Sequence, residues 1–291
     1  MDPAFERSQM GGEALAKLAE RLRGRVGYDD AATSVRSLRK LSEKLPEGVE
    51  LVATEGLVAR LRRHKEAEEV RRIAAAAELT DSVYEWLCER GLAGRTEREV
   101  QLAAEQRMRE LGAQDPSFPA IVAAGANGAL PHHEASESEI APGVLVVIDM
   151  GAIVDGYCSD CTRTFATGEP DAEAAEAYEL VRSAQAAALE ALAVGVSGKD
   201  ADAVSRGPIA EAGHGDHYGH GMGHGVGIEV HEAPGLSPRS DDLLELGDVV
   251  TVEPGIYVPD RFGVRIEDLV ALTDEGVRNL SSLDKSLRIV G

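Results

Sequence analysis

The chain has 291 residues with a hydrophobic share of 43%, which suits one large domain or one domain with a small appendage. Its formal net charge of −21 argues against nucleic acid as a partner, because phosphate binding requires basic patches. No run approaches the roughly 20 apolar residues that cross a bilayer, and the first residues lack the apolar segment of a secretory signal. We therefore expect a cytoplasmic protein without a membrane partner.

The beginning of the chain predicts a small α/β segment. Its expected elements are a helix, a strand, a second helix and a second strand, over residues 13–24, 25–30, 33–44 and 49–56. This segment is too short for a convincing core of its own. We therefore divide the chain into an N-terminal segment, residues 1–60, and a larger domain, residues 61–291.

The larger domain repeats one order of elements. The pattern predicts helix, helix, strand and hairpin in residues 66–168 and again in residues 171–272. The expected helices cover residues 57–91, 96–112, 171–194 and 200–212, and the expected strands and hairpins cover 116–133, 143–168, 217–234 and 248–272. Thr96 and Glu99 predict a capping box at one helix start. The repetition predicts an α+β fold with two related halves around one site.

The three cysteines do not predict a disulfide framework, because their number is odd and low. Cys158 and Cys161 have the spacing of a CxxC motif. The motif lies in a β-rich stretch rather than at a helix start, and the other half of a four-cysteine zinc site is missing. We expect neither a redox nor a zinc role for this pair.

Candidate metal ligands occur in short apolar or Gly-rich segments. They are Asp149, Asp160, His224, Glu253 and Glu267. Any one of them alone is more often a salt bridge or a turn cap, but burying four carboxylates together is costly unless cations neutralise them. Hard oxygen donors with one imidazole suit Mn, Co, Fe or Zn. Two such ions lie about 3.5–4 Å apart and activate a bridging water, which fits amide hydrolysis.

Strand alternation places these carboxylates on shared faces. If the first hairpin turns between Val154 and Asp155, Asp149 and Asp160 are cross-strand partners. If Asp155 and Gly156 form a two-residue turn, Asp160 faces Gly151 instead. Both registers put the two aspartates on one side of the hairpin. By the same alternation Glu253 shares a face with Thr251, and Arg265 shares one with Glu267.

Several histidines are further candidates. His132 follows a strand in the sequence LPHH, where a loop cap is the alternative role. His231 comes seven residues after His224, which on an extended strand is the opposite face, so a bend or a different role is required. His220 is expected to orient a ligand or to bond only to the backbone. Three others are not candidates and are expected in loops or at the surface, namely His133, His214 and His217.

These motifs resemble the creatinase/aminopeptidase P/methionine aminopeptidase superfamily, the pita-bread metallopeptidases, over residues 65–290. They occur in the family order as IDMG, YCSDCTRT, GHGMGHGVG, VTVEPGIY and GVRIED, with ligand intervals of 11, 64, 29 and 14 residues. The resemblance is closest to Xaa-Pro dipeptidases (prolidases), through GYCSDCTRTF, HGMGHGVGIEVHEAP, VEPGIY and GVRIED. It implies a pita-bread fold preceded by an α/β domain.

The resemblance also implies a role for each candidate. Asp149 is expected to bind one metal, Asp160 and Glu267 to bridge both, and His224 and Glu253 to complete the other. Glu253 is also expected to take a proton from the bridging water. The catalytic histidines implied are His132 and His231, which hold the substrate carbonyl and stabilise the tetrahedral intermediate. Arg265 and His220 are expected beside the ligands or in contact with substrate.

The implied activity is that of a dinuclear exopeptidase, with two Mn or Co ions, that cleaves Xaa-Pro bonds of dipeptides or short peptides through a metal-bridging hydroxide. A homodimer is also implied. The alternatives are aminopeptidase P activity, methionine aminopeptidase activity or a non-catalytic binding module of the same fold. The 14-residue interval between the glutamates favours the prolidase type over the methionine enzyme. Two features depart from the family, namely the shortened N-terminal segment and Cys161 at a position that is usually bulky and apolar.

Overall fold

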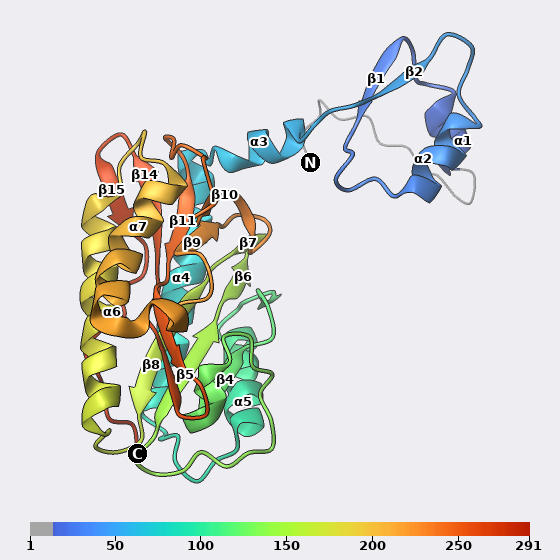
Figure 1. Cartoon of the computed structure of the whole chain (residues 1–291). Coiled ribbons are helices and arrows are strands. Elements are labelled where there is room, and N and C mark those ends of the chain that lie inside the picture. Colours follow the sequence, from blue (N-terminus) through green and yellow to red (C-terminus); the bar gives the residue numbers. More distant parts are fainter. Residues whose placement is uncertain (1–13) are drawn as a thin grey trace. The chain divides into compact units, whose positions relative to one another are not determined.

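The computed structural model describes residues 14–291, and this part of the chain divides into two compact units (Figure 1). The first unit ends at Leu61 and the second runs from Arg62 to Gly291. Elements of the first unit are α1 (Ala14–Ala19), β1 (Arg25–Tyr28), α2 (Val35–Ser42) and β2 (Glu50–Ala53), with the two strands paired in parallel. Among residues 14–61 only Ala19 is buried, so these residues form no hydrophobic core of their own.

The helical pattern that begins at Leu57 forms two helices, so the prediction of one continuous helix is wrong. α3 (Leu57–Arg63) ends before His64, and α4 (Ala67–Cys88) begins after Glu66. The Glu69 carboxylate accepts a hydrogen bond from the backbone N–H of Glu66 at 2.8 Å, which satisfies a donor that a helix start leaves free. α4 therefore begins at a capped terminus.

The predicted repetition of helix, helix, strand and hairpin is confirmed. The first half consists of α4, α5 (Glu97–Glu110), β4 (Ile121–Ala124) and a hairpin from β5 (Leu145–Met150) to β8 (Cys161–Ala166). The second half consists of α6 (Ala172–Ala191), α7 (Gly198–Ile209), β9 (Gly223–Gly225) and a hairpin from β11 (Val249–Val252) to β14 (Asp268–Thr273). The capping box of α5 also forms, since Thr96 and Glu99 exchange hydrogen bonds of 2.8 and 3.1 Å.

Each hairpin changes sheet partway along its length. β5 and β8 lie in the sheet β4-β5-β8, whereas the hairpin tip, β6 (Ala152–Val154) and β7 (Tyr157–Cys158), pairs with β3 (Asp115–Pro116). β11 and β14 lie in the sheet β10-β9-β11-β14-β15, which also contains β10 (Glu232–Leu236) and β15 (Gly276–Asn279). The tip of the second hairpin, β12 (Gly255–Val258) and β13 (Phe262–Arg265), forms a separate pair. Asp160, Glu253 and Glu267 lie at these breaks.

The helices cover the outer faces of the two hairpins (Figure 1). Tyr84 of α4, Met108 of α5 and Ile148 of β5 belong to one core cluster, while Tyr178 of α6 and Val264 of β13 belong to another. The cores thus lie between helices and strands, which leaves the opposite strand faces to form a site. None of the helices in residues 14–291 combines the length and apolar character that a membrane crossing requires.

The stretch 217–234 is not the continuous strand that was predicted. A short helical turn, η3 (Gly215–His217), precedes β9, and the chain then reverses into β10. β9 and β10 are antiparallel, with Glu232 opposite Gly225. The glycines permit this reversal because they remove side chains where two backbones approach, as at Gly225, where a Cβ would lie 2.2 Å from the Ala233 carbonyl oxygen.

Candidate metal centre

The turn at Asp155 and Gly156 sets the register of the first hairpin. Val154 pairs with Tyr157 and Asp149 pairs with Thr162, so Gly151 faces Asp160, as in the second predicted register. Gly151 allows a close approach there, because a Cβ would lie 1.9 Å from the Ser159 carbonyl oxygen. Asp149 and Asp160 line one cavity, in agreement with the shared face that both registers predicted.

The second hairpin places two glutamates opposite each other at its break. Thr251 pairs with Leu269 and Gly255 pairs with Arg265, so Glu253 and Glu267 face each other between these pairs. The Glu267 backbone N–H donates to the Thr162 carbonyl oxygen at 3.1 Å. The two hairpins therefore meet where the candidate ligands lie.

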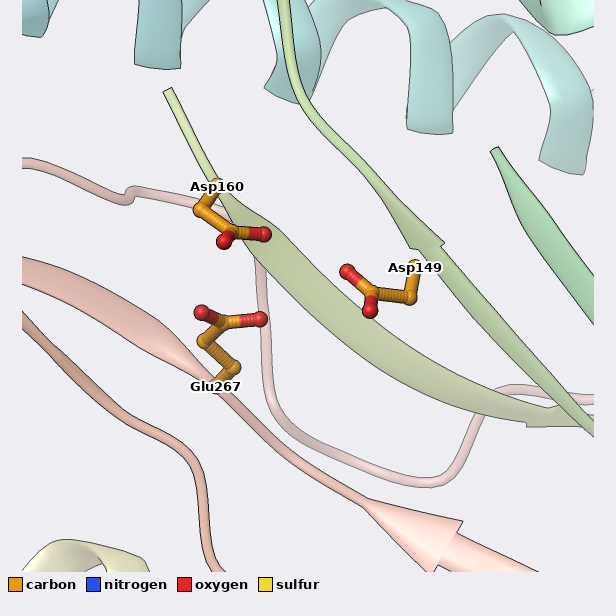
Figure 2. Close-up of side chains that lie close together, drawn as sticks. All are labelled: Asp149, Asp160 and Glu267. Atoms are coloured by element: carbon orange, nitrogen blue, oxygen red, sulfur yellow. The ribbon is translucent and has the colours of Figure 1, made fainter. Parts of the chain in front are cut away.

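Three of the carboxylates form a tight cluster (Figure 2). Asp149, Asp160 and Glu267 point toward one another, and each offers an oxygen atom that lies within 4.8 Å of the others. Asp160 is 5% exposed and Glu267 is 1% exposed. Like charges at such short range in a buried site destabilise one another unless a cation or protons neutralise them.

In two of these carboxylates, one oxygen is fixed by a hydrogen bond and the other is free. Arg265 Nη2 donates to Asp149 Oδ2 at 2.7 Å, and Thr162 Oγ1 donates to Glu267 Oε2 at 2.8 Å. Within residues 14–291, Asp149 Oδ1, Asp160 Oδ1 and Glu267 Oε1 are buried without a hydrogen-bond partner. Buried oxygens are normally satisfied, and convergent carboxylate oxygens are the donors that hard divalent cations prefer. The residues present therefore fit a metal site.

His224 adds the imidazole of the predicted ligand set. Its Nδ1 donates to the Gly225 carbonyl oxygen at 3.1 Å, and this bond leaves Nε2 with the lone pair when the ring is neutral. Nε2 lies 3.3 Å from Glu253 Oε1 and 3.7 Å from Asp160 Oδ2. A backbone carbonyl that orients the ring in this way is typical of metal-binding histidines.

Protonation equilibria reflect the crowding of these groups. Burial, and then the charges of Glu267 and Asp149, hold the pKa of Asp160 well above its ordinary value. Burial, followed by the charge of Glu253, likewise raises the pKa of Glu267. Burial acts to lower the pKa of His224, but the hydrogen bond and charge of Glu253, with the Gly225 carbonyl oxygen and the charge of Asp149, together outweigh it and the pKa is raised. In the absence of a cation, each of these three groups therefore keeps its proton to a higher pH than it ordinarily would.

Arg265 and His220 are joined through a tyrosine that the sequence analysis missed. Arg265 Nη1 donates to the Tyr257 hydroxyl at 2.9 Å, and this hydroxyl lies 2.8 Å from His220 Nε2. His220 Nδ1 donates to the Gly221 carbonyl oxygen at 2.7 Å. Both ring nitrogens of His220 are thus engaged, so its geometry suits orientation of its neighbours. The available signal was the position of Tyr257 in VEPGIY.

The cavity has a volume of about 410 Å³ and brings all the candidate residues together. Those lining it are His132, Asp149, Asp160, His220, His224, His231, Glu253, Arg265 and Glu267. The chain reversal before β10 brings the His231 ring to 4.0 Å from the His224 ring, centroid to centroid. This reversal is the bend that the seven-residue interval between the two histidines required. The His132 ring has no hydrogen bond within residues 14–291, so it is free to meet a ligand.

His133 lies in a loop, as predicted, but its side chain is only 11% exposed. Its Nε2 lies 2.8 Å from Glu97 Oε2. Glu97 also accepts hydrogen bonds from the Ala124 N–H, Asn127 Nδ2 and the Ser136 N–H and Oγ, at 2.7 to 3.1 Å. Glu97 therefore anchors the loop that carries His132. Sequence reasoning missed it because acidic residues in a first helical turn are usually exposed.

We expect Glu97→Gln to lower the free energy of unfolding by about 2–3 kcal/mol, because it weakens charge-assisted hydrogen bonds to a buried carboxylate. Urea unfolding of the metal-free protein measures this loss. Glu110→Gln, at the exposed end of the same helix, is the matched control and should unfold as the parent does. Equal stability of Glu97→Gln and the parent would contradict the anchoring role.

Comparison with known proteins places these observations in context. The sequence pattern of metallopeptidase family M24 matches residues 71–274. An Xaa-Pro dipeptidase from Pyrococcus furiosus is 43% identical over 227 residues, which are 78% of this chain and 65% of that protein. An Xaa-Pro dipeptidase structure from Bacillus anthracis has a TM-score of 0.93 and 40% identity, over 96% of this chain and 79% of that one. An X-Pro aminopeptidase structure from Thermotoga maritima has a TM-score of 0.91 and 35% identity, over 97% and 81%. These structures confirm the predicted fold.

Proposed function

Because this chain belongs to metallopeptidase family M24, we propose that it hydrolyses the peptide bond before proline in dipeptides or short peptides. The observation that carries this proposal is the convergence of three unpartnered oxygens, from Asp149, Asp160 and Glu267, in one cavity. Two bound divalent ions would supply a water nucleophile at neutral pH and polarise the scissile carbonyl. The carboxylate-rich donor set favours Mn or Co for these ions, with Fe or Zn as alternatives.

The roles we propose are those that the resemblance to the family implies, and the convergence of these side chains in one cavity supports them. Asp149 would hold one ion, Asp160 and Glu267 would hold both, and His224 and Glu253 would hold the other. Glu253 accepts a proton from the attacking water. His132 and His231 lie at the same cavity without being ligands, where they donate hydrogen bonds to the carbonyl oxygen as its charge develops.

The apolar part of the cavity supports the preference for proline. Phe118, Ile121 and Pro131 line the same cavity as the carboxylates. A proline ring is apolar and its amide nitrogen carries no N–H, so it needs shape and apolar contact rather than a hydrogen-bond acceptor. A volume of about 410 Å³ suits a small peptide held mostly inside.

Three substrates separate the candidate activities. With Mn²⁺ added, we expect hydrolysis of Ala-Pro to exceed hydrolysis of Ala-Pro-Ala and Met-Ala-Ser, measured as free amino acid released. Faster hydrolysis of Ala-Pro-Ala would assign an aminopeptidase P activity, and faster hydrolysis of Met-Ala-Ser a methionine aminopeptidase activity. No hydrolysis of any of the three, by a protein that holds Mn²⁺, would leave a binding module of the same fold.

We propose a cytoplasmic location and a homodimer with the same function. The three cysteines are free thiols, which suits a reducing compartment. Size-exclusion chromatography with light scattering tests the dimer, for which a mass near 62 kDa, twice the 30.8 kDa of one chain, is expected.

A further inference from the structure

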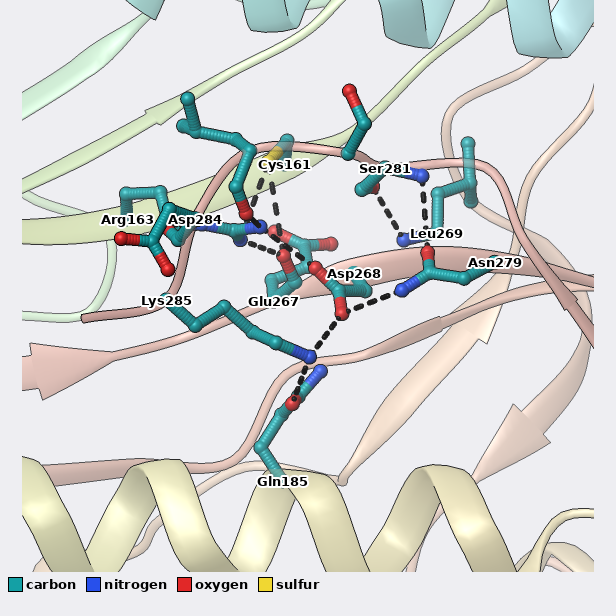
Figure 3. Close-up of polar contacts among 12 residues, drawn as sticks. Cys161, Arg163, Gln185, Glu267, Asp268, Leu269, Asn279, Ser281, Asp284 and Lys285 are labelled. Atoms are coloured by element: carbon teal, nitrogen blue, oxygen red, sulfur yellow. Dashed lines mark hydrogen bonds and ion pairs between the residues drawn. The ribbon is translucent and has the colours of Figure 1, made fainter.

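A buried arginine, Arg163, lies close to Glu267, one of the three clustered carboxylates (Figure 3). Arg163 follows Thr162 in β8, so strand alternation points its side chain to the opposite face from Thr162, whose hydroxyl bonds Glu267. Arg163 is 1% exposed. Neither the candidate ligand set nor the substrate contacts account for this costly burial.

The guanidinium of Arg163 joins two backbone segments that carry the site. Its Nη1 donates to the carbonyl oxygens of Glu267 and Thr162, the latter at 2.9 Å. Its Nη2 donates to Asp268 Oδ1 at 2.8 Å and to the Leu283 carbonyl oxygen at 2.7 Å. Nε donates to the Asp284 carbonyl oxygen at 3.3 Å. All of its N–H groups therefore have acceptors.

Asp268 extends these contacts away from the site. Asp268 Oδ2 accepts from Lys285 Nζ at 2.6 Å and from Asn279 Nδ2 at 2.9 Å. Lys285 Nζ also donates to Gln185 Oε1 of α6 at 2.9 Å. Figure 3 shows these side chains converging on the segment that begins at Glu267. The segment is thus connected to a helix of the second half and to the residues that follow β15.

The strands that Arg163 joins belong to different sheets within residues 14–291. β8 lies in the sheet β4-β5-β8, and β14 lies in the sheet β10-β9-β11-β14-β15. No strand ladder therefore fixes β8 against β14 where Asp160 and Glu267 approach each other. Apart from Arg163, the bonds there include those from the Glu267 N–H to the Thr162 carbonyl oxygen, from Thr162 Oγ1 to Glu267 Oε2, and from the Cys161 thiol to the Glu267 carbonyl oxygen at 3.7 Å.

We propose that Arg163 and Asp268 are a positioning pair for the metal centre. Arg163 bonds the carbonyl oxygens of Thr162 and Glu267 and so holds the end of one hairpin against the other, while Asp268 holds Arg163 in place. The pair thereby sets the separation at which the Asp160 and Glu267 carboxylates meet the same ions. This inference rests on the metal site proposed above, and it assigns a role to residues that touch neither metal nor substrate.

Arg163→Lys is the informative variant. Lysine keeps the positive charge but has one nitrogen in place of the planar fork, so it cannot bond both carbonyl oxygens, Asp268 and Leu283 in one geometry. We expect its apparent Kd for Mn²⁺, measured by calorimetry on chelator-treated protein, to rise about 10–100-fold, as is typical when a partner that orients a ligand is changed.

Arg63→Lys is the matched control. Arg63 bonds Asp248 through two nitrogens at 2.8 Å, and no bond joins it to the candidate ligands within the described residues. It should lose melting temperature in the metal-free state, as Arg163→Lys does, but keep the parent's Kd for Mn²⁺. A parent-like Kd in Arg163→Lys, with a similar loss of melting temperature, would show that the pair supports only the fold.

A second variant covers the case in which Arg163→Lys does not fold. Lys285→Met removes one partner of Asp268, and the Lys285 side chain is partly exposed, so the fold should tolerate the change. We expect its Kd for Mn²⁺ to rise as well, and an unchanged Kd would overturn the proposal. A parent protein that binds no Mn²⁺ would instead refute the proposed function, so the two failures are distinguishable.

Discussion

We expect the Asp160→Asn protein to fold, to lose metal binding and to lose peptidase activity by more than about 100-fold. The amide keeps the shape of the side chain but removes its charge, and Asp160 Oδ1 is one of the three oxygens of the cluster that are buried without a hydrogen-bond partner. Loss of a direct ligand should exceed the roughly 10–100-fold cost of changing a partner that merely orients one.

The fold of this variant should survive because Asp160 makes no hydrogen bond to the rest of the described chain, and its ion-pair contact is His224 at 3.7 Å. Removing one charge from the cluster also relieves repulsion. We therefore expect its melting temperature without metal to equal or exceed that of the parent. Metal content, kcat/KM and thermal unfolding together measure these effects.

Asp155→Asn is the matched control for this experiment. It makes the same chemical change at the exposed tip of the same hairpin, where φ is 49°, a conformation that asparagine tolerates. Its metal content and activity should be those of the parent. If Asp160→Asn had the metal content and activity of the parent, Asp160 would not be a metal ligand.

The carboxylate positions could be predicted because strand alternation is a local rule. It assigns a face to Asp149 and Asp160 whichever turn forms, and the register found, with Asp149 opposite Thr162, preserves that face. The same rule could show only that His231 needs a bend or a different role, because it presumes an extended chain. The reversal between β9 and β10 depends on close backbone contacts across Gly225, which periodicity does not reveal.

Long-range polar contacts were the part that the sequence could not supply. Glu97 reads as an ordinary acidic residue in a first helical turn, and its role depends on His133 and Ser136, which are 36 and 39 residues away. Arg163 likewise depends on acceptors more than 100 residues distant, including Asp268. Only folding brings such partners together, so local patterns carry no signal for them.

Metal binding should strengthen with pH, by about tenfold in apparent Kd per pH unit for each proton displaced. Asp160 and Glu267 have a raised pKa because of burial and neighbouring carboxylates, and His224 has one because Glu253, Gly225 and Asp149 together outweigh burial. A metal ion binds only the deprotonated forms of these three side chains, so any protons that they hold must leave when the ion binds. Calorimetric titration with Mn²⁺ at pH 6.5 and 7.5, in buffers of different ionisation enthalpy, measures the Kd and the protons released.

The stability of the metal-free protein should show the opposite trend. We expect its melting temperature to fall as the pH rises above 6.5. When folding raises the pKa of a carboxyl, the folded protein loses stability as the pH rises from the ordinary pKa to the raised one. The ordinary pKa values are 3.8 for Asp160 and 4.5 for Glu267. The contribution of His224 is complete below 6.5 and is lost as pH rises through its raised pKa. His220 and His231, whose pKa values are lowered, have the opposite effect, but it is complete by pH 6.5.

The gap between melting temperatures with and without Mn²⁺ should therefore widen from pH 6.5 to 8.5, and less so in Asp160→Asn. A gap that does not change with pH would mean that the cluster holds no protons for the metal to displace.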